Sequence, residues 1–234
     1  MTALPFDAVL FDCDGVLVDS EPITNGVLVQ MLGELGWQLS LEECMHIFVG
    51  KAVKDEMVMI EARTGAQLTP EWLQSFWLRR NEALERDLLI VPGADVGVRA
   101  VHAALQGRIA CASGADRRKI ELQLDKVGLL DAFEGRIFSG HETPHSKPWP
   151  DVYLAAAKAL GVDPARCAVV EDTVTGATAG LRAGATVFGY SPGGLSHSGA
   201  QAMRAIGVHH IFDDMARLHE VLAVAGSQAP RAGA

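Results

Sequence analysis

The sequence predicts an α/β protein: a doubly wound parallel-sheet core, Rossmann-like in layout, with an inserted α-helical cap domain. Three observations support this fold class. Short apolar runs recur along the chain, helix-like stretches alternate with them, and one long helical segment interrupts the alternation after the first run. Runs that are apolar throughout are typical of strands buried on both faces, as in a parallel sheet covered by helices. Alternation of strands and helices is typical of α/β proteins.

Six apolar runs are the predicted strands. They are Ala8–Phe11, Arg108–Ala112, Arg136–Phe138, Cys167–Val170, Ala185–Phe188 and His209–Phe212. The helices predicted among the later strands are Arg117–Val127, Pro150–Leu160, Val174–Ala183 and Asp214–Val224.

Between the first two predicted strands the chain is helical instead of making a short crossover. The predicted helices there are Pro22–Leu35, Leu41–Phe48, Val53–Arg63 and Pro70–Arg86. Ser40 followed by Glu43 predicts a capping box, and Thr69 before a proline predicts a second helix start.

These patterns divide the chain into two domains and a tail. We predict a core domain from residues 1–20 and 89–225, and a helical cap domain over residues 21–88, with the return to the core near Pro92. Residues 226–234 are small and polar, which predicts a flexible tail.

Composition limits the classes of function. With 234 residues and 49% hydrophobic residues, the chain can bury a large core. The net charge of −9 argues against a nucleic-acid surface, which needs a basic patch. The 4 cysteines are scattered, without zinc spacing, and are interpreted as buried reduced thiols. No apolar stretch is long enough for a membrane span, and no leader pattern is present, so we expect a cytoplasmic protein.

The first candidate functional residues are the two acids that follow the first predicted strand. Asp12 and Asp14 lie two residues apart, so an extended chain points both side chains to the same side. One carboxylate can act as nucleophile or metal ligand while the other gives and takes a proton. Gly15 allows a tight exit from the strand. An acidic turn is the alternative interpretation, and the apolar strand before it favours catalysis.

Two more features suit a phosphate group. Ser113 and Gly114 end the second strand region, where a hydroxyl and free backbone N–H groups can bind phosphate oxygens. A helix cap is the alternative for Ser113. Lys147 precedes two prolines in an extended loop, where its ammonium can neutralise a phosphate and a carboxylate together. A solvated surface lysine is the alternative.

The fourth feature is the pair Glu171 and Asp172, which ends a buried predicted strand. Carboxylates in that position are costly unless a cation or hydrogen-bond donors are near. All four features fall at the carboxyl ends of parallel strands, where open α/β sheets bind ligands. Together with Asp12, this pair gives an oxygen-only site, which favours Mg²⁺ over zinc.

In this order, the motifs D-x-D-G-x-x-x-D-S, an apolar strand ending in serine, K-P-x-P-D and E-D-T-x-x-G resemble those of the haloacid dehalogenase superfamily. The match runs from about Phe6 to Phe212. It is most similar to the branch of phosphatases and phosphomutases whose helical cap lies between the first two motifs. The resemblance implies a Mg²⁺-dependent phosphomonoester hydrolase that acts on a small phosphorylated metabolite, a sugar phosphate or phosphogluconate.

The resemblance also implies the roles of individual residues. Asp12 is the nucleophile that forms an aspartyl-phosphate, and Asp14 is the general acid and base. The residues that bind the transferring phosphoryl group are Ser113, Gly114 and Lys147. The implied magnesium ligands are Asp12, Asp14 through its backbone carbonyl, Asp172, and Glu171 directly or through water.

Other activities of the superfamily differ from a phosphatase at particular motif and cap positions. Haloacid dehalogenases and phosphonoacetaldehyde hydrolases lack an aspartate at the position of Asp14, so its presence favours cleavage of a phosphate ester. β-Phosphoglucomutases often carry a cap histidine where this chain has residues 22–24, and a cap-loop arginine where it has Val53. These departures favour a phosphatase over a mutase. A non-catalytic phosphometabolite-binding protein is a third hypothesis, although the catalytic residues are all retained.

The cap carries the candidate specificity residues Gly50, Lys51 and Lys54. The two lysines either contact a polar or anionic distal group of the substrate or are solvated at a helix start, and both interpretations remain open. Arg79 and Arg80 are predicted on an exposed helix face. Three tryptophans are predicted in the cap core: Trp37, Trp72 and Trp77.

The remaining predictions concern histidines and partners. His141 and His145, near the third motif, either line the site entrance or belong to an ordinary loop, whereas His209 and His210 are interpreted as structural. We expect a small phosphorylated metabolite as partner, no nucleic acid, no membrane, and a monomer or weak homodimer.

Overall fold

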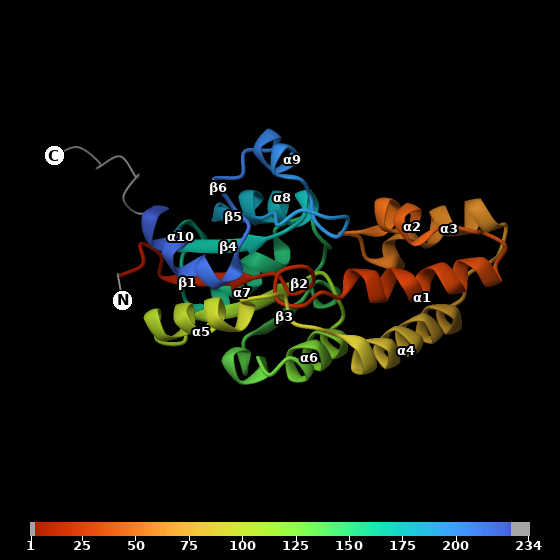
Figure 1. Ribbon diagram of the computed structural model, residues 1–234, viewed down its shortest axis with the longest axis horizontal. Coiled ribbons are helices and arrows are strands. Elements are labelled where there is room, and N and C mark those ends of the chain that lie inside the picture. The colour runs from red at the N-terminus through yellow and green to blue at the C-terminus, as the bar shows by residue number, and fades with distance from the viewer. Residues whose placement is uncertain (1–2, 226–234) are drawn as a thin grey trace.

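The computed structural model describes residues 3–225, so the predicted tail over residues 226–234 lies outside the described residues. Its core is a six-stranded sheet in the order β3-β2-β1-β4-β5-β6, with every neighbouring pair parallel (Figure 1). The strands are β1 (Ala8–Phe11), β2 (Ile109–Ser113), β3 (Ile137–Ser139), β4 (Cys167–Glu171), β5 (Thr186–Tyr190) and β6 (His210–Phe212). The strand order reverses beside β1, which is where doubly wound sheets bind ligands.

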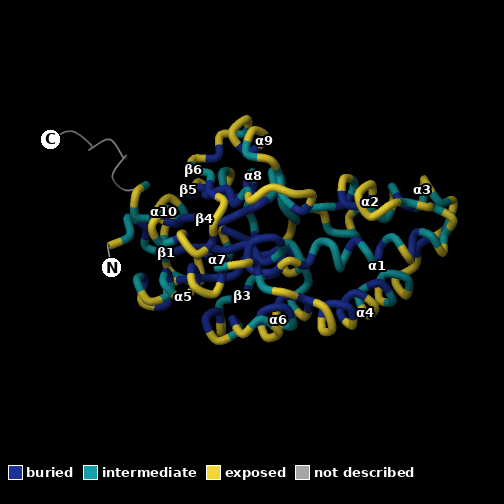
Figure 2. Tube along the Cα trace, viewed as in Figure 1, coloured by how far each residue is buried: buried dark blue, intermediate teal, exposed yellow. Residues whose placement is uncertain are grey.

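Both faces of the sheet are covered, because successive residues of a strand point to opposite faces. Val9 and Phe11 belong to one hydrophobic cluster, while Ala8 and Leu10 belong to another. The first cluster includes residues of α5 (Ala94–Ala104), α6 (Arg117–Lys126) and α10 (Leu218–Ala225). The second includes residues of α7 (Asp151–Leu160), α8 (Val174–Arg182) and α9 (Ala200–Ala205). The strands are buried at the centre (Figure 2), which confirms the predicted fold class.

Four helices between β1 and β2 form a cap with a hydrophobic cluster of its own. They are α1 (Glu21–Glu34), α2 (Leu41–Phe48), α3 (Met57–Thr64) and α4 (Pro70–Asp87). Figure 1 shows them extending from the end of the core toward which β1 runs. The predicted capping box is present, since the Ser40 hydroxyl accepts from Glu43 N at 3.2 Å and the Glu43 carboxylate accepts from Ser40 N at 2.8 Å. The Trp37, Trp72 and Trp77 side chains pack on the cap cluster, as predicted.

The two linkers between cap and core run side by side. Val18 and Ile90 form an antiparallel bridge. On either side of it, Asp19 N donates to Leu89 O at 3.0 Å and Val91 N donates to Leu17 O at 3.0 Å. The chain therefore leaves the core and returns to it through one paired hinge.

Some elements differ from the prediction. The helix predicted over Val53–Arg63 is a 3₁₀ turn, Val53–Glu56, followed by α3, and the last predicted helix is likewise divided by the 3₁₀ turn Met215–Arg217. Helix α5 was not predicted because Gly97 weakens its helical signal. That glycine is required by packing, since a Cβ there would lie 2.3 Å from Met215 O. Helix α9 was also not predicted, because six residues give too short a pattern. The other 3₁₀ turns are Leu130–Phe133, Gly140–Glu142 and Pro164–Arg166.

Cys13, Cys44, Cys111 and Cys167 are all buried free thiols, as predicted. Among residues 3–225, no helix combines the length and apolarity that crossing a membrane requires.

Candidate active site

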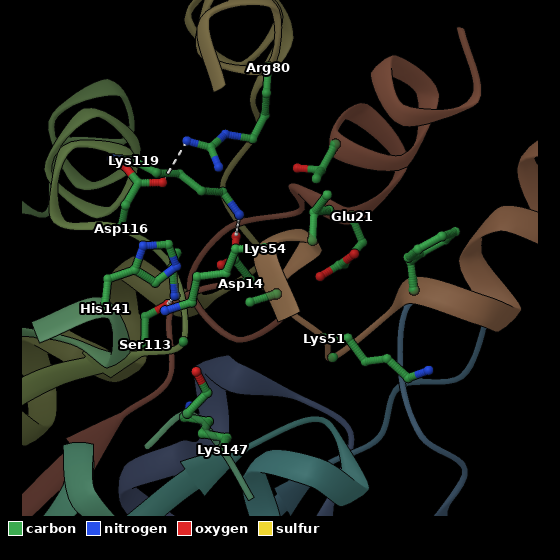
Figure 3. Close-up of a pocket in the computed structure, with 18 of the residues that line it drawn as sticks. Asp14, Glu21, Lys51, Lys54, Arg80, Ser113, Asp116, Lys119, His141 and Lys147 are labelled. Atoms are coloured by element: carbon green, nitrogen blue, oxygen red, sulfur yellow. Dashed lines mark hydrogen bonds and ion pairs between the residues drawn. The ribbon is translucent and has the colours of Figure 1, made fainter. Parts of the chain in front are cut away.

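A pocket lies between the carboxyl ends of the strands and the cap (Figure 3), and residues of all four motifs line it. The core side includes Asp12, Asp14, Ser113, Gly114, Lys147 and Glu171. The cap side includes Glu21, Thr24, Gly50, Lys51, Lys54 and Arg80. Motifs from distant parts of the sequence therefore meet in one place because their strands end at one edge of the sheet.

Lys147 joins the predicted nucleophile, Asp12, to Glu171, a predicted metal ligand. Its Nζ donates to Asp12 Oδ1 at 2.7 Å and to Glu171 Oε1 at 2.6 Å, and its side chain is only 9% exposed. The lysine also lies over the Tyr153 ring, 4.7 Å from its centroid. Burial raises the pKa of Asp12 to about 7, and Lys147 offsets part of that effect. The nucleophile candidate thus lies in a dry site beside a fixed cation.

Asp172 is the one member of this cluster whose carboxylate lacks a hydrogen-bond partner among the described residues. It is 1% exposed, and neither of its carboxylate oxygens has a hydrogen-bond partner. Burial raises its pKa well above the usual range, and the neighbouring carboxylates Glu171 and Asp12 raise it further. Gly15 makes room for this side chain, since a Cβ there would lie 2.1 Å from Asp172 Oδ2. A carboxyl group in this environment ionises only when a cation lies beside it.

Glu171 differs from Asp172 because its oxygens already accept several hydrogen bonds. The hydroxyl of Tyr153 donates to Oε1 at 2.6 Å, beside Lys147. Asp172 N and Thr173 N donate to Oε2 at 3.1 and 3.3 Å. Gly176 is needed here, since a Cβ would lie 1.7 Å from Glu171 Oε1. Glu171 therefore orients Lys147, while Asp172 keeps its lone pairs available.

These residues fit a divalent metal ion. Oxygen atoms of Asp12, Glu171 and Asp172 lie within 4.8 Å of one another, and all three residues are buried. The set contains only carboxylate oxygens, which are ligands for hard cations such as Mg²⁺. A cation would supply the missing partner of Asp172 and would favour the ionised form of Asp12.

Asp14 lines the same pocket but is bound by different donors. Its Oδ1 accepts from Lys119 Nζ at 2.7 Å, from Gln123 Nε2 at 2.8 Å, and from the Ser20 hydroxyl. Burial alone would raise the pKa of Asp14, but the Lys119 ammonium and the other donors lower it to about 2. In this arrangement Asp14 is an anion.

Lys119 and Gln123 were not predicted from the sequence. Both are buried on α6, next to the apolar residues Ile120 and Leu124. The sequence did carry a signal for them, because two polar residues four positions apart on the apolar face of an amphipathic helix indicate a buried polar partner. Because that face turns toward the end of β1, they reach Asp14 across the sheet edge.

Ser113 ends β2 and is 1% exposed, yet it lines the pocket. Its role as a phosphate ligand stays a prediction. Its hydroxyl accepts from Ala115 N at 3.1 Å. At Gly114 a Cβ would meet nothing within 4 Å, so this position faces open space.

The three predicted specificity residues of the cap have different surroundings. Gly50 has a φ of +75°, and a Cβ there would lie 3.2 Å from Thr173 Cγ2, so the cap touches the core at this point. Lys51 is paired with Glu56 at 3.7 Å, is 45% exposed, and points away from the centre of the pocket (Figure 3). Lys54 extends into the pocket toward Ser113 and His141 (Figure 3).

The predicted exposure of Arg80 is wrong. Arg80 is 4% exposed, and its Nη2 donates to Asp116 Oδ2 of the core at 2.8 Å. The reason is that α4 lies against α6, so one face of this cap helix is covered. Arg79 points the other way, remains exposed, and pairs with Glu34 at 2.6 Å.

His141 also lines the pocket. This position favours the interpretation in which the histidine belongs to the site over the one in which it belongs to an ordinary loop. Its ring lies 6.1 Å from the Trp77 ring of the cap. Burial lowers the pKa of His141, and the Lys54 ammonium lowers it further. His145 is exposed and contacts Asp151 at 3.2 Å instead.

Comparison with known proteins shows which family the chain resembles. Residues 6–184 match the family model of haloacid dehalogenase-like hydrolases. The chain is 31% identical to 6-phosphogluconate phosphatase of Escherichia coli K12 over 78% of this chain and 81% of that protein. It is 30% identical to hexitol phosphatase B of the same strain over 72% of this chain and 76% of that protein.

A solved structure supports the same relationship. The crystal structure of a haloacid dehalogenase family hydrolase from Deinococcus radiodurans R1, with bound phosphate and sodium, has a TM-score of 0.74 and 36% identity. It covers 97% of this chain and 99% of that chain. The family match spans more than half of the sequence and includes all four motifs. The chain belongs to the haloacid dehalogenase-like hydrolase family.

Proposed function

We propose that this protein is a Mg²⁺-dependent phosphatase that hydrolyses a phosphomonoester of a small metabolite, a sugar phosphate or phosphogluconate. The observation that carries the proposal is the buried, unpartnered carboxylate of Asp172 beside Asp12, which Lys147 holds in place. Relatives named as phosphatases of phosphogluconate and hexitol phosphates support it.

The proposed reaction has two steps. In the first, Asp12 attacks phosphorus, the bond to the leaving oxygen breaks, and Asp14 protonates the departing alcohol. In the second, Asp14 removes a proton from water, which attacks the aspartyl-phosphate and releases inorganic phosphate. Lys147, Ser113 and Gly114 bind the phosphoryl oxygens during both steps.

Magnesium would be held by Asp12, Asp172 and the backbone carbonyl of Asp14, with Glu171 acting through water because its oxygens already accept hydrogen bonds. The bound ion would offset the repulsion between the phosphate dianion and the attacking carboxylate.

The two roles of Asp14 require different protonation states. The pKa of about 2 makes it an anion, the form that accepts a proton from water. To protonate a leaving alcohol, its carboxyl group must first lose its contact with Lys119. The proposed cycle therefore includes a change in the Asp14–Lys119 ion pair.

We propose that the chain divides by role, with residues 1–20 and 89–225 supplying the chemistry and residues 21–88 supplying selectivity. The proposed selectivity residues are Gly50, Lys51 and Lys54. A cap in this position also excludes bulk water during phosphoryl transfer.

The test is release of inorganic phosphate from a panel of sugar phosphates and an aryl phosphate, with and without Mg²⁺. We expect Mg²⁺-dependent turnover that Asp12→Asn abolishes. Asp125→Asn, which removes an exposed carboxylate on α6, is the matched control and retains activity. The proposal is wrong if the wild-type protein hydrolyses no phosphomonoester in Mg²⁺, or if Asp12→Asn is fully active.

Two alternatives have distinct outcomes. A β-phosphoglucomutase-like enzyme would convert β-glucose 1-phosphate into glucose 6-phosphate, whereas a phosphatase releases inorganic phosphate. A non-catalytic binding protein would bind phosphorylated metabolites without turnover. We also propose a cytoplasmic monomer or weak homodimer, acting without nucleic acid or membrane, and light scattering after size exclusion tests the oligomeric state.

A further inference from the structure

Three cationic side chains of the cap line the pocket, namely Lys51, Lys54 and Arg80 (Figure 3). They differ in their counter-ions. Lys51 is paired with Glu56 at 3.7 Å and points away from the centre of the pocket. Arg80 is bound to Asp116 Oδ2 at 2.8 Å and to Asn81 Oδ1 at 2.8 Å. Lys54 forms no ion pair or side-chain hydrogen bond with any residue between 3 and 225. Among the described residues, the pocket therefore contains a cation whose charge no neighbour neutralises by direct contact.

Two carboxylates lie near Lys54, but no hydrogen bond or ion pair joins either of them to it. Asp55 is the next residue along the chain, and its charge also acts on His141. Asp116, the carboxylate on this wall, is already bound by Arg80 and also accepts from Lys119 N at 3.0 Å as the cap of α6. His141 carries a lowered pKa and contributes no negative charge. Glu21 lies on the opposite wall of the pocket (Figure 3). An unpaired cation in a partly enclosed site is unfavourable, and an anionic group of a ligand would neutralise it.

The opposite wall carries polar groups suited to hydroxyls. The Thr24 hydroxyl oxygen is buried and has no partner among the described residues, although Thr24 lines the pocket. Beside it, Glu21 is held by Asn25, whose Nδ2 donates to Glu21 Oε2 at 2.8 Å. A buried hydroxyl without a partner is costly and indicates a missing hydrogen-bonding group.

We infer that the substrate is a phosphorylated sugar acid whose distal carboxylate binds Lys54 and whose hydroxyls bind Thr24 and Glu21. This inference rests on the proposed phosphatase function and narrows its substrate class. One unneutralised ammonium matches a singly charged carboxylate better than a second, doubly charged phosphate. A neutral sugar phosphate would leave Lys54 without a counter-ion.

A competing role for Lys54 is contact with the transferring phosphoryl group, because the side chain extends toward Ser113. The two roles predict different patterns of selectivity. Every substrate has the phosphoryl group, but only a sugar acid has the carboxylate. Two substrates that differ only at the distal end therefore distinguish them.

The experiment compares 6-phosphogluconate with glucitol 6-phosphate, in which a hydroxymethyl group replaces the carboxylate. We expect the wild-type protein to prefer 6-phosphogluconate in kcat/KM. Lys54→Met should lower kcat/KM for 6-phosphogluconate about ten- to hundred-fold, the loss typical of one charge-assisted hydrogen bond, and for glucitol 6-phosphate about three-fold or less. Lys54→Arg keeps the charge and should restore most of the preference.

The matched control is Arg79→Met, which removes a cap cation that is 43% exposed and bound to Glu34 outside the pocket. It should leave the preference unchanged. Equal losses on both substrates in Lys54→Met would assign Lys54 to the phosphoryl group and overturn the inference. A wild-type preference for glucitol 6-phosphate would overturn it too.

Failure of the inference and failure of the proposed function are distinguishable. Turnover of phosphomonoesters without any preference for the acid contradicts only the inference. Binding of both compounds to the Asp12→Asn protein, measured by calorimetry, gives a readout that needs no turnover. Weaker binding of 6-phosphogluconate than of glucitol 6-phosphate would contradict the inference. Tighter binding of 6-phosphogluconate, with the difference lost when Lys54→Met is added, would support it.

Discussion

Lys119 Nζ lies 2.7 Å from Asp14 Oδ1, a buried ion pair between residues that are 105 positions apart. The lysine comes from the first turn of α6 and the aspartate from the turn after β1. This contact sets the charge of the residue that the proposed reaction uses for proton transfer.

Replacing Lys119 should move the pH dependence of catalysis. Burial alone would raise the pKa of Asp14, and the Lys119 ammonium is the main group that holds it at about 2, so loss of the ammonium raises it. In Lys119→Met, Asp14 then protonates at a higher pH, and the acidic limb of the pH–rate profile shifts upward. The profile is measured as kcat from about pH 4 to about pH 8, because kcat includes the hydrolysis step in which Asp14 acts as the base.

Lys126→Met is the control for this experiment, because Lys126 is an exposed lysine at the other end of α6. Its acidic limb should coincide with that of the wild-type protein. An unchanged profile in Lys119→Met would show that the ion pair does not govern the titration of Asp14.

Asp172→Asn should separate metal binding from folding. The substitution removes a buried carboxylate that has no partner among the described residues, so the metal-free variant should be at least as stable as the wild-type protein. Mg²⁺ should stabilise the wild-type protein by about 2.7 kcal/mol at 100 times its Kd, and the variant much less. Thermal unfolding with and without Mg²⁺ measures both effects. Equal stabilisation of the two proteins would remove Asp172 from the metal site.

The Arg80–Asp116 ion pair joins cap to core, and its contribution should depend on pH. Burial alone would raise the pKa of Asp116, but Arg80 lowers it below the usual value. A depressed folded pKa means that the stabilisation is present above the unfolded value near 3.8 and is lost as pH falls through the folded value. At pH 7, Arg80→Met should cost about 2–4 kcal/mol, since the partly buried Asp116 loses its counter-ion and keeps only the hydrogen bond from Lys119 N.

Urea unfolding at neutral pH and near pH 3 tests this prediction. The difference between Arg80→Met and wild type should narrow at the lower pH, where Asp116 becomes protonated. A double-mutant cycle with Asp116→Asn isolates the pair, because asparagine also caps a helix start. A coupling energy near zero at neutral pH would contradict the prediction.

Gly50→Ala should lower both stability and activity. Its φ of +75° costs a non-glycine residue about 1–2 kcal/mol, and the new Cβ would lie 3.2 Å from Thr173 Cγ2 of the core. Gly65→Ala is a matched control, since φ is +69° there and a Cβ would meet nothing within 4 Å. The two variants should lose similar free energy of unfolding, but only Gly50→Ala should lower kcat/KM, through the position of the cap. Equal kcat/KM values would contradict a role for this contact.

Most of the fold could be predicted from the sequence because burial is encoded locally. A continuous apolar run such as the one that forms β4 needs helices on both sides, and helix starts such as Ser40 carry their own signal. Helix α5 was missed because Gly97 lowers its local helix propensity. The glycine is needed for close packing against Met215, which is distant in the sequence, so local propensity cannot reveal the reason for it.

The candidate site could be predicted only in part. Its carboxylates, Ser113 and Lys147 follow strand ends, and parallel strands bring their ends together without further information. Arg80 and Lys119 could not be predicted in the same way. Their partners lie 36 and 105 positions away, and the choice depends on which faces of α4 and α6 turn toward the pocket.

The paired hinge formed by Val18 and Ile90 has a consequence for how such an enzyme changes over generations. Because the exit and the return of the chain are neighbours, lengthening or exchanging the segment between them costs little loop-closure entropy and leaves the sheet in register. Mutations, insertions and whole replacements can therefore accumulate beyond the hinge while Asp12 and Asp172 stay where they are. A change of substrate through the cap therefore requires no change in the residues that carry out the reaction.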